Sequence, residues 1–167
     1  ESLDEGPVYD VSEVEISDSD NRISLEKKLV AKAKLNIVDV IQKISNGLQP
    51  VPQVDNNVSY CRKITKEDGR INFEETAKEI FNKYRAFSGW PGTYFQYKDT
   101  TIKIHGMRII DLDNNDTPGT IFDVTKDGIH IRVDDSVIVI THIQLPGKKI
   151  INSSDIYNSY KDFFVKI

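Results

Sequence analysis

The chain has 167 residues, a formal net charge of −4 and a single cysteine, Cys61. This length is enough for one hydrophobic core, or for one small domain and part of another. One cysteine excludes an internal disulfide and any metal site built from several cysteines, and no apolar run approaches the roughly 18–20 residues of a membrane span. We therefore expect a protein of the reducing cytoplasm, without a membrane partner.

The charge is spread unevenly along the chain. Residues 1–59 hold six Lys/Arg against eleven Asp/Glu, a net −5, so that residues 60–167 are almost neutral at +1. Overall charge therefore does not indicate a nucleic-acid partner, and such a partner would have to bind a local basic patch.

The first 47 residues show the pattern of one strand and one helix. A short strand region is predicted over residues 8–16. A helix is predicted from an N-cap at Ser24 to about Asn46, with Gly47 as its C-terminal stop. Each of these elements has one apolar face to bury, and the two cannot enclose a core alone. We expect residues 1–47 to be the last unit of a larger domain.

Residues 48–72 read as an extended linker. Pro50 and Pro52 stiffen its backbone and deny it a helix. Three basic side chains follow within five positions, and they either are solvated or face phosphate groups: Arg62, Lys63 and Lys66.

The only tryptophan lies where one hydrophobic period gives way to another. Residues 73–87 carry apolar side chains at helical spacing, and residues 101–105 alternate as a half-buried strand does. This alternation predicts that Lys103 points outward, opposite to the face of Ile102 and Ile104. The glycines and proline of residues 88–92 end the helix and redirect the backbone. We predict that Trp90 is a large apolar plug, buried at this corner between helix and strand.

Short strands with turn signals between them fill most of the remaining sequence. Asp127-Gly128 is a strong hairpin signal, and Ser153 or Ser154 is predicted to cap a final amphipathic helix. Strands this short and this closely spaced favour a small closed barrel of the oligonucleotide-binding (OB) type. The predicted strands are 94–97, 101–111, 119–124, 128–133 and 137–145.

Few residues point to chemistry by themselves. The three histidines lie in predicted strands, without metal-ligand spacing and without a cysteine partner, so no metal site is predicted. Asp4, just before Gly6-Pro7, suits either a simple turn or an orienting carboxylate in a rigid loop. Lys148 and Lys149 follow a Pro-Gly turn, which places both ammonium groups at an exposed loop tip.

Four collinear segments resemble motifs of the methionyl-tRNA formyltransferase family. Leu-Asp-Glu-Gly-Pro at residues 3–7 resembles its Asp-x-Gly-Leu-Asp-Thr-Gly motif, and residues 60–73 resemble its Tyr-Ala-x-Lys-Ile…Ile-Asp-Trp joint. Arg-Ala-Phe and Trp-Pro-Gly within residues 85–92 resemble its Arg-Ala-Phe-Asn-Pro-Trp-Pro motif. Residues 144–158 resemble its tail, with a glutamine, Gly-Lys-Lys, an aspartate and an asparagine in order. Departures from the motifs occur at Ser2, Glu5 and Ser88-Gly89.

The resemblance implies an enzyme that transfers a formyl group from 10-formyltetrahydrofolate to the amino group of methionine on initiator tRNA. It implies that Asp4 is the catalytic carboxylate, whereas the family's asparagine and histidine belong to a segment before residue 1. We therefore expect the chain alone to be inactive. The resemblance also implies a cytoplasmic protein that needs no metal, and we expect a monomer. Phosphate contacts are expected from Arg62, Lys63, Lys66, Arg85, Lys148 and Lys149.

The fold class expected is an α+β fragment. Residues 1–47 would be the end of a Rossmann-type formyltransferase domain, with one strand and one helix. Residues 48–72 would be the interdomain linker, and residues 73–167 a small OB-like β-barrel with flanking helices. Two other functions stay open: a sugar-nucleotide N-formyltransferase, which shares the catalytic motif, and a non-catalytic RNA-binding barrel protein. The linker joint and the lysine-bearing tail favour the tRNA enzyme.

Overall fold

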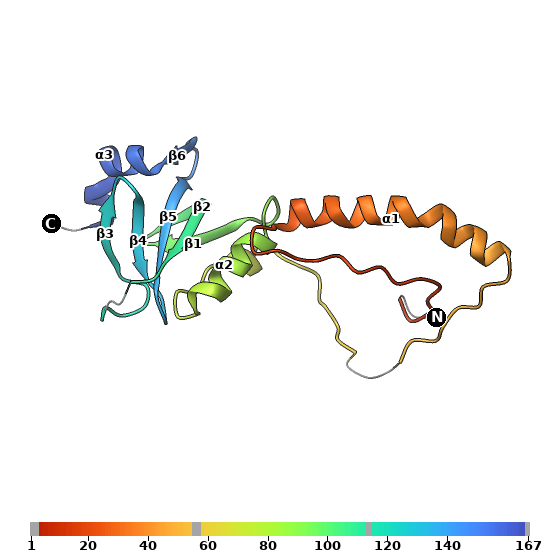
Figure 1. The fold of residues 1–167 in the computed structure, drawn as a ribbon. Coiled ribbons are helices and arrows are strands. Elements are labelled where there is room, and N and C mark those ends of the chain that lie inside the picture. The colour runs from red at the N-terminus through yellow and green to blue at the C-terminus, as the bar shows by residue number, and fades with distance from the viewer. Residues whose placement is uncertain (1–3, 55–57, 113–114, 166–167) are drawn as a thin grey trace. The chain divides into compact units, whose positions relative to one another are not determined.

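The computed structural model describes residues 4–54, 58–112 and 115–165. Its internal contacts divide the chain into two units, Glu1–Lys63 and Ile64–Ile167, which Figure 1 shows in warm and in green-to-blue colours. The division falls inside the stretch predicted as a linker, residues 48–72.

The main element of the first unit is helix α1 (Arg22–Ser45). It begins with a capping box in which the Asn21 side chain accepts hydrogen bonds from the backbone N–H groups of Ile23 and Ser24. The Ser24 hydroxyl in turn accepts from the Asn21 N–H at 3.0 Å. The predicted cap at Ser24 is therefore wrong, because Ser24 occupies the third helical position of the box. The predicted end is confirmed by Gly47, which has φ +96° just past the helix.

The strand predicted over residues 8–16 does not form. In the described residues of the first unit, the only strand-like pairing is an isolated antiparallel bridge between Val8 and Val51. The backbone N–H of each donates to the carbonyl of the other at 2.8 Å. A strand needs a neighbouring strand for its backbone groups, and residues 8–16 are offered a partner at one position only.

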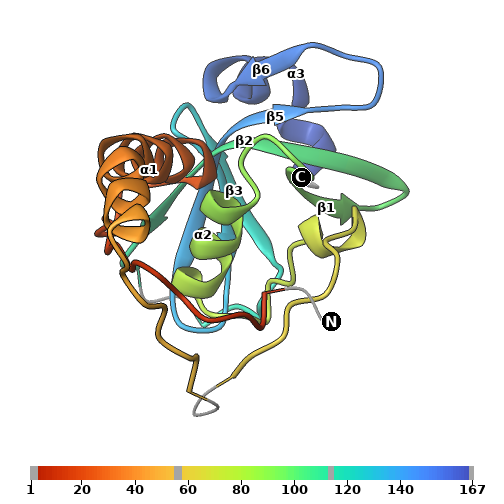
Figure 2. The ribbon, with the colours of Figure 1, turned by 90° about the vertical axis from the view of Figure 1, so that its right-hand side faces the viewer.

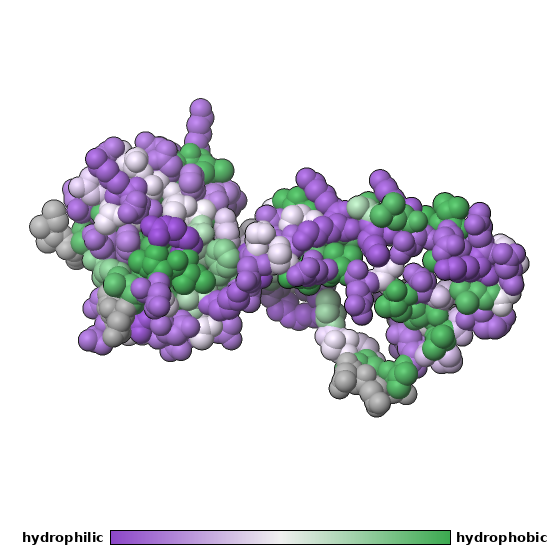
Figure 3. Space-filling model, in the orientation of Figure 1, coloured by the Kyte–Doolittle hydropathy of each residue, from purple (hydrophilic) through white to green (hydrophobic). Residues whose placement is uncertain are grey.

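The apolar face of α1 is uncovered within this unit. No residue of the helix is buried, and Leu35 and Val38 are 78% and 62% exposed. Figure 3 shows such hydrophobic side chains in green along the surface of the unit. The described residues of the first unit therefore form no hydrophobic core. No helix in the described parts of the chain is both long and apolar enough to cross a membrane.

The second unit is built on one antiparallel six-stranded sheet. The strand order is β1-β2-β5-β4-β3, with the short β6 paired to β5. All five predicted strands are confirmed, and β6 was missed because its three residues are too few to show a period. The strands are β1 (Thr93–Tyr97), β2 (Thr100–Ile110), β3 (Ile121–Thr125), β4 (Gly128–Arg132), β5 (Val137–Gln144) and β6 (Ile150–Asn152).

This sheet is open, so the closed OB-like barrel is not what the structure shows. Strands β1 and β3 stand at opposite ends of the order and do not pair with each other. Closure would need a hydrogen-bonded ladder between these two strands. The unit is an α+β fold with an antiparallel sheet.

Three helices accompany the sheet. The short 3-10 helix η1 (Glu67–Gly69) precedes α2 (Ala77–Ala86), which packs on β2. Helix α3 (Ser153–Phe164) packs on β3 and β4, and Figure 2 shows it beside β5 and β6. Thr76 caps α2 in a capping box with Glu79, and hydrogen bonds from Thr76 lower the pKa of Glu79. Asn152 caps α3, in place of the predicted Ser153 or Ser154, because its side chain accepts from the Asp155 N–H at 3.0 Å.

One continuous core lies between the sheet and the helices. Helices α2 and α3 and strands β1 to β5 each contribute side chains that are almost completely removed from solvent. Burial of this kind is the main driving force of folding. We infer that residues 64–167 fold without the first unit. The largest buried side chains include Ile80, Phe95, Ile102, Ile129, Ile138, Ile140, Ile156 and Phe164.

The prediction that Trp90 is a buried plug is wrong, since Trp90 is 52% exposed. Backbone groups fill the corner instead. A Cβ atom placed on Gly69 would lie 2.2 Å from the carbonyl oxygen of Gly92, so η1 packs directly on the turn after α2. The aromatic core beside this corner is made by Phe95, whose ring meets that of Phe73 edge-on with centroids 5.6 Å apart.

Truncating these two aromatic residues should therefore have opposite consequences. Phe95→Ala removes a buried ring and should lower the free energy of unfolding by about 3–5 kcal/mol. Trp90→Ala should cost less than about 1 kcal/mol, as expected for an exposed side chain. Urea unfolding followed by circular dichroism measures both. A loss at Trp90 as large as that at Phe95 would contradict the exposed position.

Candidate functional site

Asp4 lies in a tight turn that a distant residue holds in place. Its backbone has φ +62°, a left-handed conformation that aspartate tolerates better than most residues. The side-chain amide of Gln53 donates to the carbonyls of both Asp4 and Gly6 at 2.8 Å. The loop is therefore fixed by a residue 49 positions away, and the exposed carboxylate is free to meet a second group.

Two of the predicted phosphate-binding residues, Arg62 and Lys63, belong to the end of the first unit. Both are exposed in irregular backbone. The Arg62 guanidinium donates to the carbonyl of Lys63 at 3.3 Å. Phosphate binding by these two residues stays a prediction.

In the second unit, a hollow of about 240 Å³ opens between the C-terminal end of α2 and strands β1 and β2. Lys103 and His105 are exposed on the outward face of β2, as the alternation predicted for Lys103. Because the same alternation applies at position 105, the pattern could also have placed His105 in this wall. Aromatic and cationic groups therefore share one surface, with Tyr84, Phe87, Pro91, Tyr94, Lys103 and His105 among the lining residues.

A chain of hydrogen bonds joins this hollow to the lysine-bearing turn. The Tyr84 hydroxyl donates to the carbonyl of His105 at 3.1 Å; burial raises the pKa of Tyr84, so the phenol stays protonated at neutral pH. The His105 Nε2 lies 3.2 Å from Gln144 Oε1, and Gln144 Nε2 donates to the carbonyl of Lys148 at 2.9 Å. Helix α2, strands β2 and β5 and the turn after β5 are thus fixed to one another.

A glycine in β2 makes this arrangement possible. The ladder between β2 and β5 shifts register on both sides of Gly106. A Cβ atom at Gly106 would lie 2.4 Å from Thr141 Oγ1 and 2.6 Å from His142 Nδ1. The irregularity needs a residue without a side chain, and it lies immediately after His105.

Lys148 and Lys149 are exposed as the sequence predicted. The turn that carries them is closed by a hydrogen bond from the Lys148 N–H to the Leu145 carbonyl at 3.0 Å, and Gly147 takes φ +69°. Within the part of the chain that the structure describes, neither lysine forms an ion pair. Both ammonium groups are therefore available to an anion.

The last two predicted basic residues differ in their availability. Lys66 is exposed just before η1, which packs against Gly92 of the hollow. Arg85 is half-buried; its guanidinium donates to Asn82 Oδ1 at 2.8 Å and lies 6.0 Å from the centroid of the Phe81 ring. Arg85 is thus partly engaged with its own helix.

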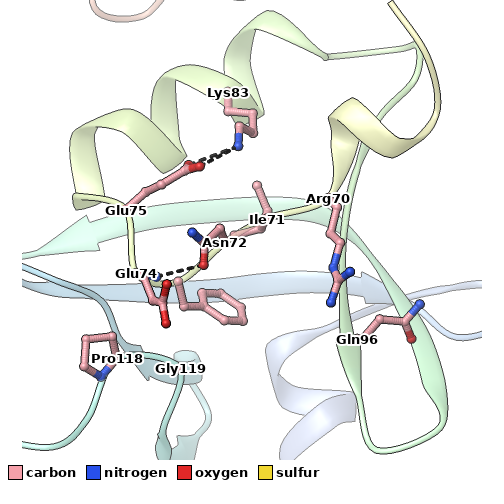
Figure 4. Close-up of a pocket in the computed structure, with 10 residues that line it drawn as sticks. Arg70, Ile71, Asn72, Glu74, Glu75, Lys83, Gln96, Pro118 and Gly119 are labelled. Carbon is pink, nitrogen blue, oxygen red and sulfur yellow. Dashed lines mark hydrogen bonds and ion pairs between the residues drawn. The ribbon is translucent and has the colours of Figure 1, made fainter.

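A second hollow, of about 540 Å³, is drawn in Figure 4. The Lys83 ammonium lies 3.0 Å from both carboxylate oxygens of Glu75 at one end, and Arg70 and Gln96 lie at the other. Its charges are of both signs and partly paired. It favours a polyanion less than the 240 Å³ hollow, whose lining includes Lys103 and no acidic side chain. No group of three or more His, Cys, Asp or Glu side chains suited to a metal ion occurs in residues 4–54, 58–112 and 115–165.

The chain is similar to known proteins over most of its length. Residues 63–161 match the family described as "Formyl transferase, C-terminal domain". Three relatives are named methionyl-tRNA formyltransferase. The protein from Sulfurihydrogenibium sp. is 36% identical to this chain over 95% of its length, and the one from Francisella philomiragia is 37% identical over 93%. The protein from Caldicellulosiruptor saccharolyticus is 36% identical over 96% of this chain. The alignments cover 52%, 49% and 52% of those relatives, so the chain spans about half of their length.

Solved structures support the fold. A crystal structure of a variant of HypX from Aquifex aeolicus aligns with 99% of this chain and 30% of that chain, with a TM-score of 0.66 and 17% identity. A structure of HypX in complex with tetrahydrofolic acid aligns with 78% of this chain and 23% of that chain, with a TM-score of 0.52 and 17% identity. At these identities the likeness establishes the fold alone.

Proposed function

The chain belongs to the formyl transferase family, whose C-terminal domain it carries, and from this premise we propose that it is the tRNA-binding half of a methionyl-tRNA formyltransferase. The enzyme would transfer a formyl group from 10-formyltetrahydrofolate to the amino group of methionine on initiator tRNA. The observation that carries the proposal is identity of 36–37% over 93–96% of the chain to proteins of that name. Their names favour tRNA over an amino sugar as the acceptor.

Asp4 would serve the transfer of a proton. The reaction joins the amine nitrogen of methionine to the formyl carbon, so the amine must lose a proton as it attacks. A carboxylate can orient a histidine and assist that loss, while an asparagine and a protonated histidine stabilise the developing oxyanion. The fixed turn that Gln53 holds suits such a role, because it presents the Asp4 carboxylate without a flexible backbone. The family resemblance assigns the asparagine and histidine to positions that this chain does not match.

The donor is a folate, which supplies the formyl group. HypX, which has a similar fold, was solved in complex with tetrahydrofolic acid, and by analogy we propose a folate donor here. The described residues include no group that we assign to the folate.

The second unit would bind the phosphate backbone of tRNA. Lys148 and Lys149 lie on a turn that hydrogen bonds fix beside the hollow, and Lys103 and Lys66 add positive charge to the same unit. Phosphate contacts position a protein on RNA without reading its sequence. A nearly neutral chain can bind in this way, because affinity depends on the local contacts.

The lysine turn gives a measurable signature. The double change Lys148→Ala and Lys149→Ala should weaken binding to initiator and elongator tRNA alike. It should also flatten the plot of log affinity against log salt by about one to two units, since each neutralised phosphate releases counterions. Fluorescence anisotropy of labelled tRNA over a salt series measures the slope. Lys126→Ala, at the exposed β3–β4 turn, is the matched control and should leave the slope unchanged. An unchanged slope in the double variant, or a loss confined to initiator tRNA, would contradict backbone binding.

The role of Asp4 needs an enzyme in which residues 1–167 are joined to the segment that carries the family's asparagine and histidine. There Asp4→Asn should reduce the rate of formyl transfer to methionyl-tRNA by at least about 100-fold, the scale of general acid–base catalysis. Asparagine keeps the size of the side chain and tolerates positive φ, so stability should change little. Glu5→Gln in the same loop is the control and should stay close to wild type. Activity of Asp4→Asn within a few-fold of wild type would remove Asp4 from the mechanism.

A further inference from the structure

Trp90 is displayed on a tightly built turn and contributes little to the core. It is 52% exposed and is the only tryptophan of the chain. The turn is held by hydrogen bonds from the Gly92 N–H to the Phe87 carbonyl at 3.0 Å and from the Ser88 N–H to the Arg85 carbonyl at 3.3 Å. The backbone of Gly69 also packs closely against Gly92 of this turn. The half-exposed indole is therefore presented from a fixed backbone.

Trp90 lies on the turn beside the 240 Å³ hollow. Its chain neighbours Gly89 and Pro91 both line the 240 Å³ hollow, to which Lys103 and His105 also contribute. From His105 the hydrogen bonds through Gln144 lead to the backbone of Lys148. Trp90 itself does not line the hollow, so its exposed ring belongs to the turn beside it, and the lysine turn is joined to the wall of the hollow through Gln144 and His105.

We propose that Trp90 is a stacking platform for one unpaired base of the bound RNA, with the flanking phosphates on Lys103 and Lys148. The proposal rests on the proposed function, because it requires an RNA ligand. An exposed aromatic ring beside cationic side chains is how proteins hold single-stranded nucleic acid: bases stack on the ring while the charges follow the backbone. A base inside a duplex has both faces covered by its neighbours, so the stacked nucleotide must be unpaired.

Stacking of this kind is tolerant of sequence. Every base has an aromatic face, so the ring recognises an exposed nucleotide without distinguishing which base it is. Trp90 would therefore add affinity and fix the position of a single-stranded segment. It would not discriminate initiator from elongator tRNA.

The fluorescence of Trp90 makes the contact directly visible, since no other tryptophan contributes. The full chain is titrated with bulk tRNA and, separately, with inorganic polyphosphate, which has the charge of RNA but no bases. Binding itself is followed by anisotropy of labelled tRNA. We expect tRNA to quench the tryptophan emission and polyphosphate to leave it unchanged.

Three variants complete the test. Trp90→Ala should weaken tRNA binding by roughly 10-fold, equivalent to about 1.4 kcal/mol and within the range for one stacked base, and should leave the salt slope unchanged. Trp90→Phe should restore most of the affinity, because it keeps an aromatic face. Tyr9→Ala removes another exposed ring, in the first unit, and should have no effect.

The outcomes separate this proposal from the proposed function. If tRNA binds without quenching, or Trp90→Ala binds as the wild type does, the stacking role is overturned while tRNA binding stands. Equal quenching by polyphosphate would also overturn it, since that ligand has nothing to stack. If labelled tRNA does not bind the wild-type chain, both are overturned.

Discussion

The pairing of β2 with β5 is the constraint on which the rest of the second unit depends. The ladder runs from Lys103 opposite Gln144 to Ile110 opposite Val137. Because side chains alternate along a strand, the register on each side of Gly106 decides which residues of β2 face the core. It turns the core side chains toward the helices and presents the polar side chains near Gly106 on the opposite face. The hydrophobic core and the candidate RNA-binding surface are therefore two consequences of the same backbone hydrogen bonds.

Elements with a clear period could be predicted from the sequence, and features decided by distant contacts could not. The alternation of residues 101–105 correctly indicated a strand with Lys103 outward. Nothing local shows that Gly69 packs on the Gly92 backbone, which leaves Trp90 outside. Closure of a barrel likewise depends on pairing between the end strands, and strand periodicity carries no information about which edges meet.

The candidate site also has features that the sequence predicts and features that it does not. The Pro-Gly turn before Lys148 predicted an exposed loop tip, and the structure has one. Its attachment to the hollow was not predictable, because His105 and Gln144 are 39 positions apart and meet only across the sheet. The Asp4 loop shows the same limit: its motif could be read in the sequence, whereas the clamp by Gln53 comes from a segment that reads as a linker.

The proposed phosphate binding lies in the second unit, which has its own core and contains Lys148 and Lys149. The most direct test is the salt dependence of tRNA binding by residues 64–167 alone. We expect this unit to bind tRNA, with a plot of log affinity against log salt whose slope is about −2 or steeper, from at least two phosphate contacts. A slope near zero, or no binding by a folded unit, would show that affinity resides elsewhere and would contradict the account.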